Sequence, residues 1–176
     1  QIGQRINLPM TNPPDVRSRM KMWTGSVMGR CISDALVKTG YCSADWVEKE
    51  FFYKNYKGKI DGFIPSENAI LEIKTSDDDS ITKYKDMPGH YLTQGLWYCL
   101  ASGVPNLIIL QFGKNQGLMR SRKFEITPEW VVKLEGAMKA TAYWWEQYER
   151  TKELPPCLHQ YVWEGKYCAY GNGKSI

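Results

Sequence analysis

The chain contains two strongly apolar segments, Ala69–Lys74 and Asn106–Phe112, separated by a segment with helical spacing from about His90 to Ser102. Short apolar runs between turn residues are typical of buried strands, and strands that alternate with helices are typical of α/β proteins. This order restricts the chain to a mixed α/β domain, in which a sheet is flanked by helices.

The rest of the chain extends this order at both ends. Apolar positions recur at helical spacing from Asp15 to Lys38, with Gly40 as a stop signal. Thr127 and Pro128 are typical of the start of a last long helix, which Pro155-Pro156 ends. Further strands are expected at Trp46–Tyr56, Lys59–Ile64 and Leu118–Ile126, with turns at Lys57-Gly58, Ser66–Asn68 and Gly113–Gly117, and a solvated polar tract at Thr75–Lys85. An antiparallel meander is expected from the first three strands along the chain, Trp46–Tyr56, Lys59–Ile64 and Ala69–Lys74.

Length, composition and cysteine usage favour one intracellular domain, in the cytoplasm of a prokaryote or in the host cell interior if the protein is viral. The 176 residues fit a single domain over 1–176, with an irregular lead-in at 1–14 and a tail at 157–176. The hydrophobic content of 43% is enough for a core and excludes wholesale disorder. No apolar run approaches the length of a membrane span, so no membrane association is expected. Five scattered cysteines without a CxxC pair favour a reducing setting over a disulfide framework.

Two carboxylates and a lysine stand in two of the expected strands. Asp61 has apolar neighbours, and Glu72 lies between Leu71 and Ile73. Buried carboxylates are costly unless a charge compensates them, and Mg²⁺ or Mn²⁺ prefers carboxylate oxygens. Glu72 and Lys74 share one face of their strand, which an antiparallel partner carrying Asp61 would also reach. The pattern predicts a metal bound by Asp61, Glu72 and the Ile73 carbonyl, with Lys74 orienting or deprotonating an attacking water.

The spacing of these residues resembles a known nuclease motif. Asp61…Glu72-Ile73-Lys74 is similar to the PD-(D/E)xK motif, in the form found in RecB-type exonucleases, and Gln94-Gly-Leu-Trp-Tyr98 is similar to the QxxxY motif of that branch. CRISPR-associated and phage RecB-like nucleases belong to the same group. The resemblance implies a restriction-endonuclease-like fold and a Mg²⁺- or Mn²⁺-dependent site, in which Gln94 and Tyr98 position the DNA backbone.

The first helix departs from this family. RecB-type enzymes usually carry a His there, four residues after a Gly, as another metal ligand. Here Gly25 is followed at that spacing by Gly29. Glu50 is a candidate substitute ligand, although an acid near a strand edge is more often a solvated charge.

The cysteines also depart from a family pattern. CRISPR-associated members and their viral relatives hold an iron–sulfur cluster with one N-terminal and three C-terminal cysteines. Cys157 and Cys168 have a fitting position, with Cys31 or Cys42 as the distant partner. Because the close cysteine pairs of such clusters are absent, we expect buried, unligated thiols instead of an iron–sulfur cluster.

Together these features predict a metal-dependent deoxyribonuclease with DNA as its partner, and an exonuclease acting from ends in first place. The resemblance implies a role in phage, viral or prokaryotic recombination or repair. Two alternatives share the fold: a structure- or sequence-selective endonuclease, and a nucleic-acid-binding module without chemistry. The intact set of Asp61, Glu72 and Lys74 favours an enzyme, whereas the absent histidine favours the binding module.

Overall fold

The structure, a computed structural model, describes residues 15–83 and 86–152, which belong to two compact units. The larger unit, Met22–Glu135, contains all the strands of the described residues. The expected lead-in at 1–14 and tail at 157–176 lie outside the described residues, as do Pro155-Pro156, Cys157 and Cys168. A single domain over 1–176 therefore stays a prediction. None of the described helices is long and apolar enough to cross a membrane.

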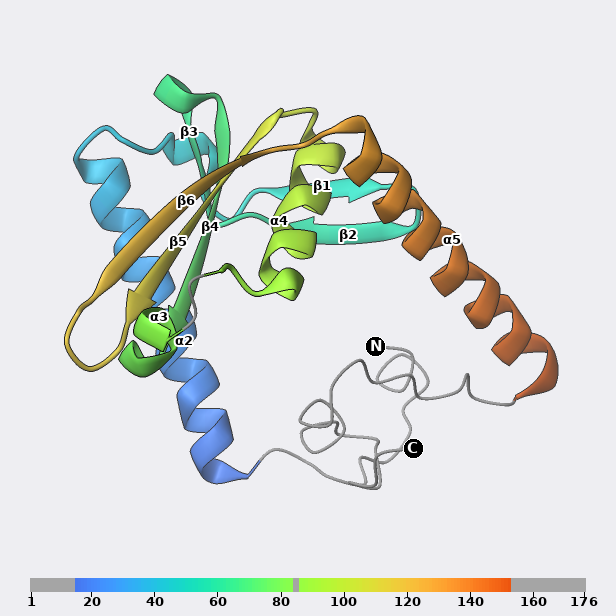
Figure 1. Cartoon of the computed structure of the whole chain (residues 1–176), viewed down its shortest axis with the longest axis horizontal. Coiled ribbons are helices and arrows are strands. Elements are labelled where there is room, and N and C mark those ends of the chain that lie inside the picture. Colours follow the sequence, from blue (N-terminus) through green and yellow to red (C-terminus); the bar gives the residue numbers. More distant parts are fainter. Residues whose placement is uncertain (1–14, 84–85, 153–176) are drawn as a thin grey trace. The chain divides into compact units, whose positions relative to one another are not determined.

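Helices and strands follow one another nearly as the sequence predicted (Figure 1). The described helices are α2 (Val16–Lys38), α3 (Asp78–Lys83), α4 (Gly89–Ser102) and α5 (Pro128–Thr151), with 3₁₀ turns η1 (Ala44–Trp46) and η2 (Pro65–Glu67). The strands are β1 (Glu50–Tyr53), β2 (Tyr56–Lys59), β3 (Gly62–Ile64), β4 (Ala69–Ser76), β5 (Asn106–Gly113) and β6 (Met119–Glu125). Gly40 has a left-handed φ of 75° just after the end of α2. At the start of α5 the Thr127 hydroxyl accepts a hydrogen bond from the Trp130 amide. Both expected helix boundaries are confirmed.

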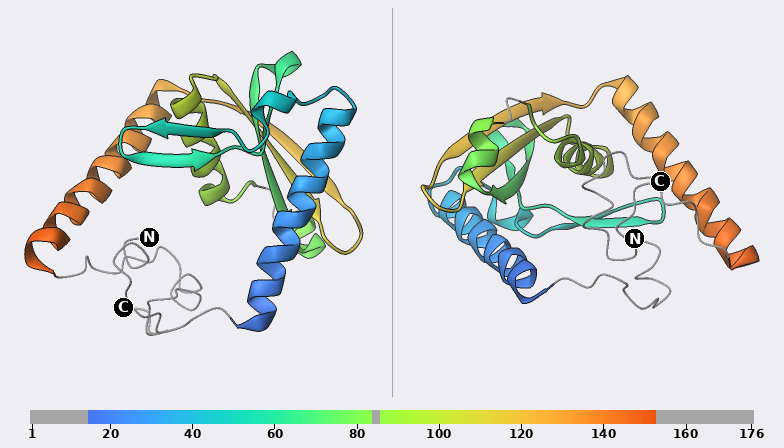
Figure 2. Two further views of the ribbon diagram at one scale, coloured as in Figure 1. Left: turned by 180° about the vertical axis from the view of Figure 1, so that it is seen from behind. Right: turned by 60° about the horizontal axis from the view of Figure 1, so that its bottom comes forward.

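Four strands form the central mixed sheet, in the order β3-β4-β5-β6. Strand β4 is parallel to β5, and α4 connects the two, whereas the β3–β4 and β5–β6 pairs are antiparallel. Strands β1 and β2 form a separate two-stranded hairpin, which extends past α4 (Figure 2). The predicted fold class, a mixed sheet flanked by helices, is confirmed.

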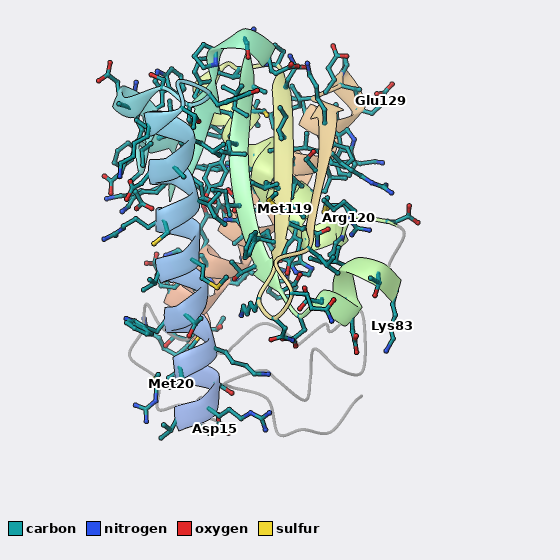
Figure 3. The ribbon with its side chains drawn as sticks, turned by 90° about the vertical axis from the view of Figure 1, so that its left-hand side faces the viewer. Asp15, Met20, Lys83, Met119, Arg120 and Glu129 are labelled. Atoms are coloured by element: carbon teal, nitrogen blue, oxygen red, sulfur yellow. The ribbon has the colours of Figure 1, made fainter. Side chains whose placement is uncertain are left out.

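Alternate residues of β4 pack against different helices. Ile70 belongs to a core cluster with β5 and α4. Leu71 and Ile73 belong to a second cluster, which includes residues of α2. In Figure 3 the segment of α2 that follows Met20 runs beside β4. Because strand residues alternate between faces, Glu72 and Lys74 lie on the face of the sheet that α4 covers.

The predicted strand pairing was wrong around residue 55. The sequence placed a turn at Lys57-Gly58, but the turn lies at Lys54-Asn55, where Lys54 has a φ of 54°. Gly58 is instead a strand residue facing α4: a Cβ atom there would lie 2.5 Å from the Tyr98 ring. The glycine is needed for close packing, not for a turn. The expected meander is therefore split between two sheets.

The polar tract after β4 was also predicted wrongly. It contains α3, and Asp78 is only 5% exposed. The Asp78 carboxylate accepts the backbone amides of Asn115 (2.9 Å) and Gln116 (3.2 Å) in the turn between β5 and β6. Its role is to hold that turn, which no local pattern reveals because the partners are 37 and 38 residues away.

Candidate active site

Asp61 lies at the break between β2 and β3, not inside a continuous strand as the sequence predicted. The β3–β4 pairing sets Gly62 opposite Leu71, and continuing it by one residue sets Asp61 opposite Glu72. At the break the Asp61 carboxylate takes the place of a backbone carbonyl as the partner of β4. Its Oδ2 accepts a hydrogen bond from the Ile73 amide at 2.6 Å. The side chain of Asp61 is thereby fixed against β4.

Glu72 and Lys74 form an ion pair beside Asp61. Lys74 Nζ lies 2.5 Å from Glu72 Oε1, and the two side chains are 19% and 3% exposed. A buried ion pair of this kind loses hydration on both partners, so packing alone does not account for it. The pair instead concentrates charge at one end of the α4-covered face.

Helix α4 adds two polar side chains to this pair. Lys74 Nζ donates to Gln94 Oε1 at 2.8 Å, and Gln94 Nε2 donates to the Tyr98 hydroxyl at 3.1 Å. Gln94 and Tyr98 share one helical face because they are four residues apart. The ring of Tyr91 lies 5.3 Å from the Lys74 ammonium. Thus all five side chains predicted for the site lie in one neighbourhood.

Burial and mutual repulsion perturb the acids of the site. Burial raises the pKa of Glu72 to about 7, the Asp61 charge adds to the rise, and Lys74 opposes it. Burial also raises the pKa of Asp61, against the Ile73 amide and Lys74. The pKa of Tyr98 is raised chiefly by burial, with Glu72 and Asp61 contributing. The site therefore favours added positive charge.

The donor set fits a hard divalent cation. Mg²⁺ needs only one or two carboxylates when waters and a substrate phosphate complete its coordination. The N–H and C=O groups of one strand residue face the same neighbour, so the Ile73 carbonyl lies on the Asp61 side of β4. Within the described ranges no three His, Cys, Asp or Glu side chains are grouped closely enough to hold a metal alone. Asp61, Glu72 and the Ile73 carbonyl are the groups that fit such an ion.

Ser33 supports the site in a way that the sequence did not indicate. Its hydroxyl donates to the Asp61 backbone carbonyl at 3.1 Å, and the residue is 3% exposed. Ser33 shares a helical face with Leu36 and Val37, which pack on the sheet. A serine on an apolar helix face was the available signal.

Glu48 is a further acid near the candidate site. The Glu48 charge raises the pKa of both Asp61 and Tyr98, although Glu48 itself is paired with Lys59 at 2.5 Å. Glu48 also has a left-handed φ of 54°, which is uncommon for a residue with a side chain. Glu50 pairs with Lys57 at 2.9 Å on the exposed hairpin, as a solvated charge would.

The described cysteines form no disulfide. Cys42 and Cys99 are buried as expected, and their thiols donate to the carbonyls of Phe63 (3.2 Å) and Asn106 (3.3 Å). Cys31 is exposed, against the expectation of a buried thiol.

No protein-family model matches the sequence, and no curated protein matches it. Solved structures do share its fold. The protein SSO0001 aligns with a TM-score of 0.52 at 17% identity, over 84% of this chain and 66% of its own. The alkaline exonuclease LHK-Exo from Laribacter hongkongensis aligns with a TM-score of 0.56 at 13% identity, over 74% of this chain and 72% of its own. A phage-related exonuclease from Haemophilus somnus 129PT aligns with a TM-score of 0.52 at 13% identity, over 73% of this chain and 71% of its own.

These identities show a shared fold and nothing finer. The chain spans 66% of SSO0001 and 71–72% of the two exonuclease structures. LHK-Exo is also known in complex with dAMP, and that structure aligns with a TM-score of 0.53 at 14% identity.

Proposed function

We propose that this protein is a divalent-metal-dependent deoxyribonuclease and that Asp61, Glu72 and Lys74 form its reaction centre. The observation that carries the proposal is the convergence of the buried Glu72, the half-buried Asp61 and the Lys74 ammonium at the break between β2 and β3. Packing does not require such a cluster, because each buried charge costs free energy. Shared fold with two exonuclease structures supports the same conclusion.

Asp61, Glu72 and the Ile73 carbonyl would hold Mg²⁺ or Mn²⁺. When bound, the ion polarises the phosphodiester and offsets the charge that develops as the bond breaks. Its presence also favours the ionised form of Glu72, whose pKa of about 7 otherwise leaves it partly protonated near neutral pH.

Lys74 positions the attacking water. An ammonium has three N–H donors, and those of Lys74 serve Glu72 and Gln94 with one remaining for water or a phosphate oxygen. The water oxygen bonds to phosphorus and releases one proton to solvent, the phosphorus–oxygen bond to the leaving sugar breaks, and solvent protonates the leaving alkoxide. Gln94 fixes Lys74 on one side and the Tyr98 hydroxyl on the other. The Gln94–Tyr98 pair holds the DNA backbone against the site.

We infer that the enzyme is an exonuclease, because two of the three solved structures named above are exonucleases. A role in recombination or repair belongs to the same proposal. The competing endonuclease and the non-catalytic binding module make different predictions about substrate ends and about Lys74.

The test uses end-labelled linear DNA and closed circular DNA, incubated with the full chain and Mg²⁺ or Mn²⁺. We expect degradation of the linear substrate only, and none in excess EDTA. Lys74→Ala is expected to lower the rate by about 10²–10⁴-fold while DNA binding persists. Cleavage of the closed circle would identify an endonuclease instead.

Activity that persists in excess EDTA would refute the metal dependence. An unmodified protein that binds DNA but cleaves neither substrate would identify a binding module.

A further inference from the structure

The β1–β2 hairpin carries an exposed face that the proposed reaction does not use. Strand pairing sets Phe52 opposite Lys57, and Glu50 opposite Lys59, and all four residues are exposed. We call these four residues the outer face of the hairpin. Phe52 is 66% exposed, and the Lys57 ammonium lies 5.5 Å from the centre of its ring.

The opposite face fixes the hairpin beside the candidate active site. A Cβ atom at Gly58 would lie 2.5 Å from the Tyr98 ring and 2.7 Å from the Trp97 ring, so the strand and α4 are in close contact. Near the turn, the Tyr53 hydroxyl donates to Glu135 at 2.8 Å. The hairpin therefore has a defined position relative to Tyr98.

Strand β2 leads directly into the reaction centre. Lys57 and Lys59 are alternate residues of β2, which ends two residues before Asp61, and two residues of a strand span about 6.5 Å. This repeat is similar to the length of one nucleotide in an extended single strand. Lys59 and Lys57 are thus spaced to contact successive phosphates on the approach to Asp61.

The charge of the segment fits a polyanion. Residues 48–59 contain four lysines and two glutamates. The Lys57–Glu50 and Lys59–Glu48 ion pairs have side chains that are 42–54% exposed. Exposed pairs contribute little stability, so a phosphate can replace either glutamate at small cost.

We propose that the outer face binds a single DNA strand, with an unpaired base stacked on Phe52 and phosphates paired with Lys57 and Lys59. Aromatic rings combined with basic side chains are the means by which proteins bind single-stranded nucleic acid. In a duplex the base faces are already stacked, so Phe52 selects an unpaired segment and directs it to Asp61. The inference rests on the proposed function, because it takes Asp61 as the reaction centre.

The experiment measures binding of a short labelled single-stranded oligonucleotide by the full chain in EDTA, where no cleavage occurs. Phe52→Ala is expected to weaken binding on the order of 10-fold. Phe52→Leu is expected to weaken it similarly, and Phe52→Tyr to preserve it, because stacking needs an aromatic ring. Tyr41→Ala is the matched control, since Tyr41 is an aromatic residue 64% exposed outside the hairpin.

Salt dependence tests the lysines separately. Removal of one phosphate-binding lysine should reduce the slope of log K against log salt by about 0.7 for a single strand. Lys57→Ala is expected to show this change. Lys123→Ala should not, although Lys123 forms an equivalent exposed ion pair with Glu67 at 2.8 Å.

Photocrosslinking of an iodouracil-substituted oligonucleotide is expected to mark Phe52. Binding by Phe52→Ala that equals the wild type, or a crosslink only outside the hairpin, would overturn the hairpin proposal. If the wild type still cleaves linear DNA, the proposed function survives that result. Conversely, the wild type could fail to cleave DNA while Phe52→Ala still weakens binding. That result would support the single-strand-binding surface and refute the proposed nuclease activity.

Discussion

Asp61 accepts a hydrogen bond from the backbone amide of Ile73 at 2.6 Å, so a side chain stands where a neighbouring strand would otherwise pair. This bond ties one proposed metal ligand to the residue whose carbonyl is another. It also makes Asp61 a structural residue, because the Ile73 amide would lose its partner without it.

The two functions of Asp61 can be separated by substitution. Asp61→Ala leaves the Ile73 amide without this partner, which should cost about 1–3 kcal/mol of unfolding free energy. Asp61→Asn keeps an oxygen acceptor and should retain more stability. Both variants should lose cleavage, because alanine offers no ligand atom and the neutral amide of asparagine is a poor ligand for Mg²⁺ or Mn²⁺. Urea unfolding in EDTA, beside a cleavage assay, measures the two effects. Equal stability of the Ala and Asn variants would contradict the structural role.

The raised pKa of Glu72 makes the metal-free protein less stable at neutral than at acidic pH. The carboxyl has a pKa of about 7 when folded and an ordinary value of 4.5. Between these values the folded state binds more protons, so stability falls as pH rises through this window. The difference corresponds to roughly 3 kcal/mol. Glu72→Gln should remove most of this dependence.

Urea unfolding at pH 5 and pH 8 in EDTA checks this prediction. The control is Glu125→Gln, because Glu125 is an exposed acid on β6. A wild type whose pH dependence equals that of Glu72→Gln would show that Glu72 titrates normally. Added Mn²⁺ should restore the stability of the wild type at pH 8 and leave Glu72→Gln unchanged, since binding to the folded state stabilises it.

Gln94 should matter more than the Tyr98 hydroxyl. Gln94 contacts both Lys74 and Tyr98, whereas the hydroxyl contacts Gln94. Gln94→Ala should lower the single-turnover cleavage rate by about 10–100-fold, the range seen when groups that orient a site are removed. Tyr98→Phe should have a smaller effect, with Tyr41→Phe as an exposed control. An equal loss in Tyr98→Phe would show that the hydroxyl acts on the DNA by itself.

The order of elements could be predicted because hydrophobic periodicity and turn residues record it locally. The spacing from Asp61 to Lys74 indicated the candidate site for the same reason: alternate strand residues share a face. Ser33 and Asp78 escaped prediction because their roles depend on partners 28 and 37 residues away. Local sequence carries no record of the Asp78 contacts, and for Ser33 it offers only the sign of a serine on an apolar helix face.

The hairpin shows a different limit of local reasoning. Gly58 was interpreted as a turn residue, since glycine favours turns, but its lack of a side chain serves contact with α4. The turn lies instead at Lys54-Asn55, where the left-handed backbone falls on Lys54, a residue type that rarely adopts it. As a result Asp61 was placed inside a strand and Glu48 was overlooked.

Gly95, between Gln94 and Tyr98, should be required for the packing of α4 on the sheet. A Cβ atom at Gly95 would lie 2.5 Å from two carbons of the fully buried Leu107, so either the leucine or α4 must shift. Gly95→Ala should therefore destabilise the protein by about 1–3 kcal/mol, despite the better helix propensity of alanine.

Gly29→Ala is the matched control, because a Cβ atom added there in α2 would meet no other part of the described structure within 4 Å. There the propensity effect acts alone and should stabilise the protein by up to about 1 kcal/mol. Thermal unfolding of both variants tests whether Gly95→Ala lowers the stability while Gly29→Ala raises it. The displaced helix should also lower the cleavage rate of Gly95→Ala, because Gln94 and Tyr98 move with it, while Gly29→Ala cleaves normally. Stabilisation by both substitutions would show that α4 does not approach β5 as closely as the structure has it.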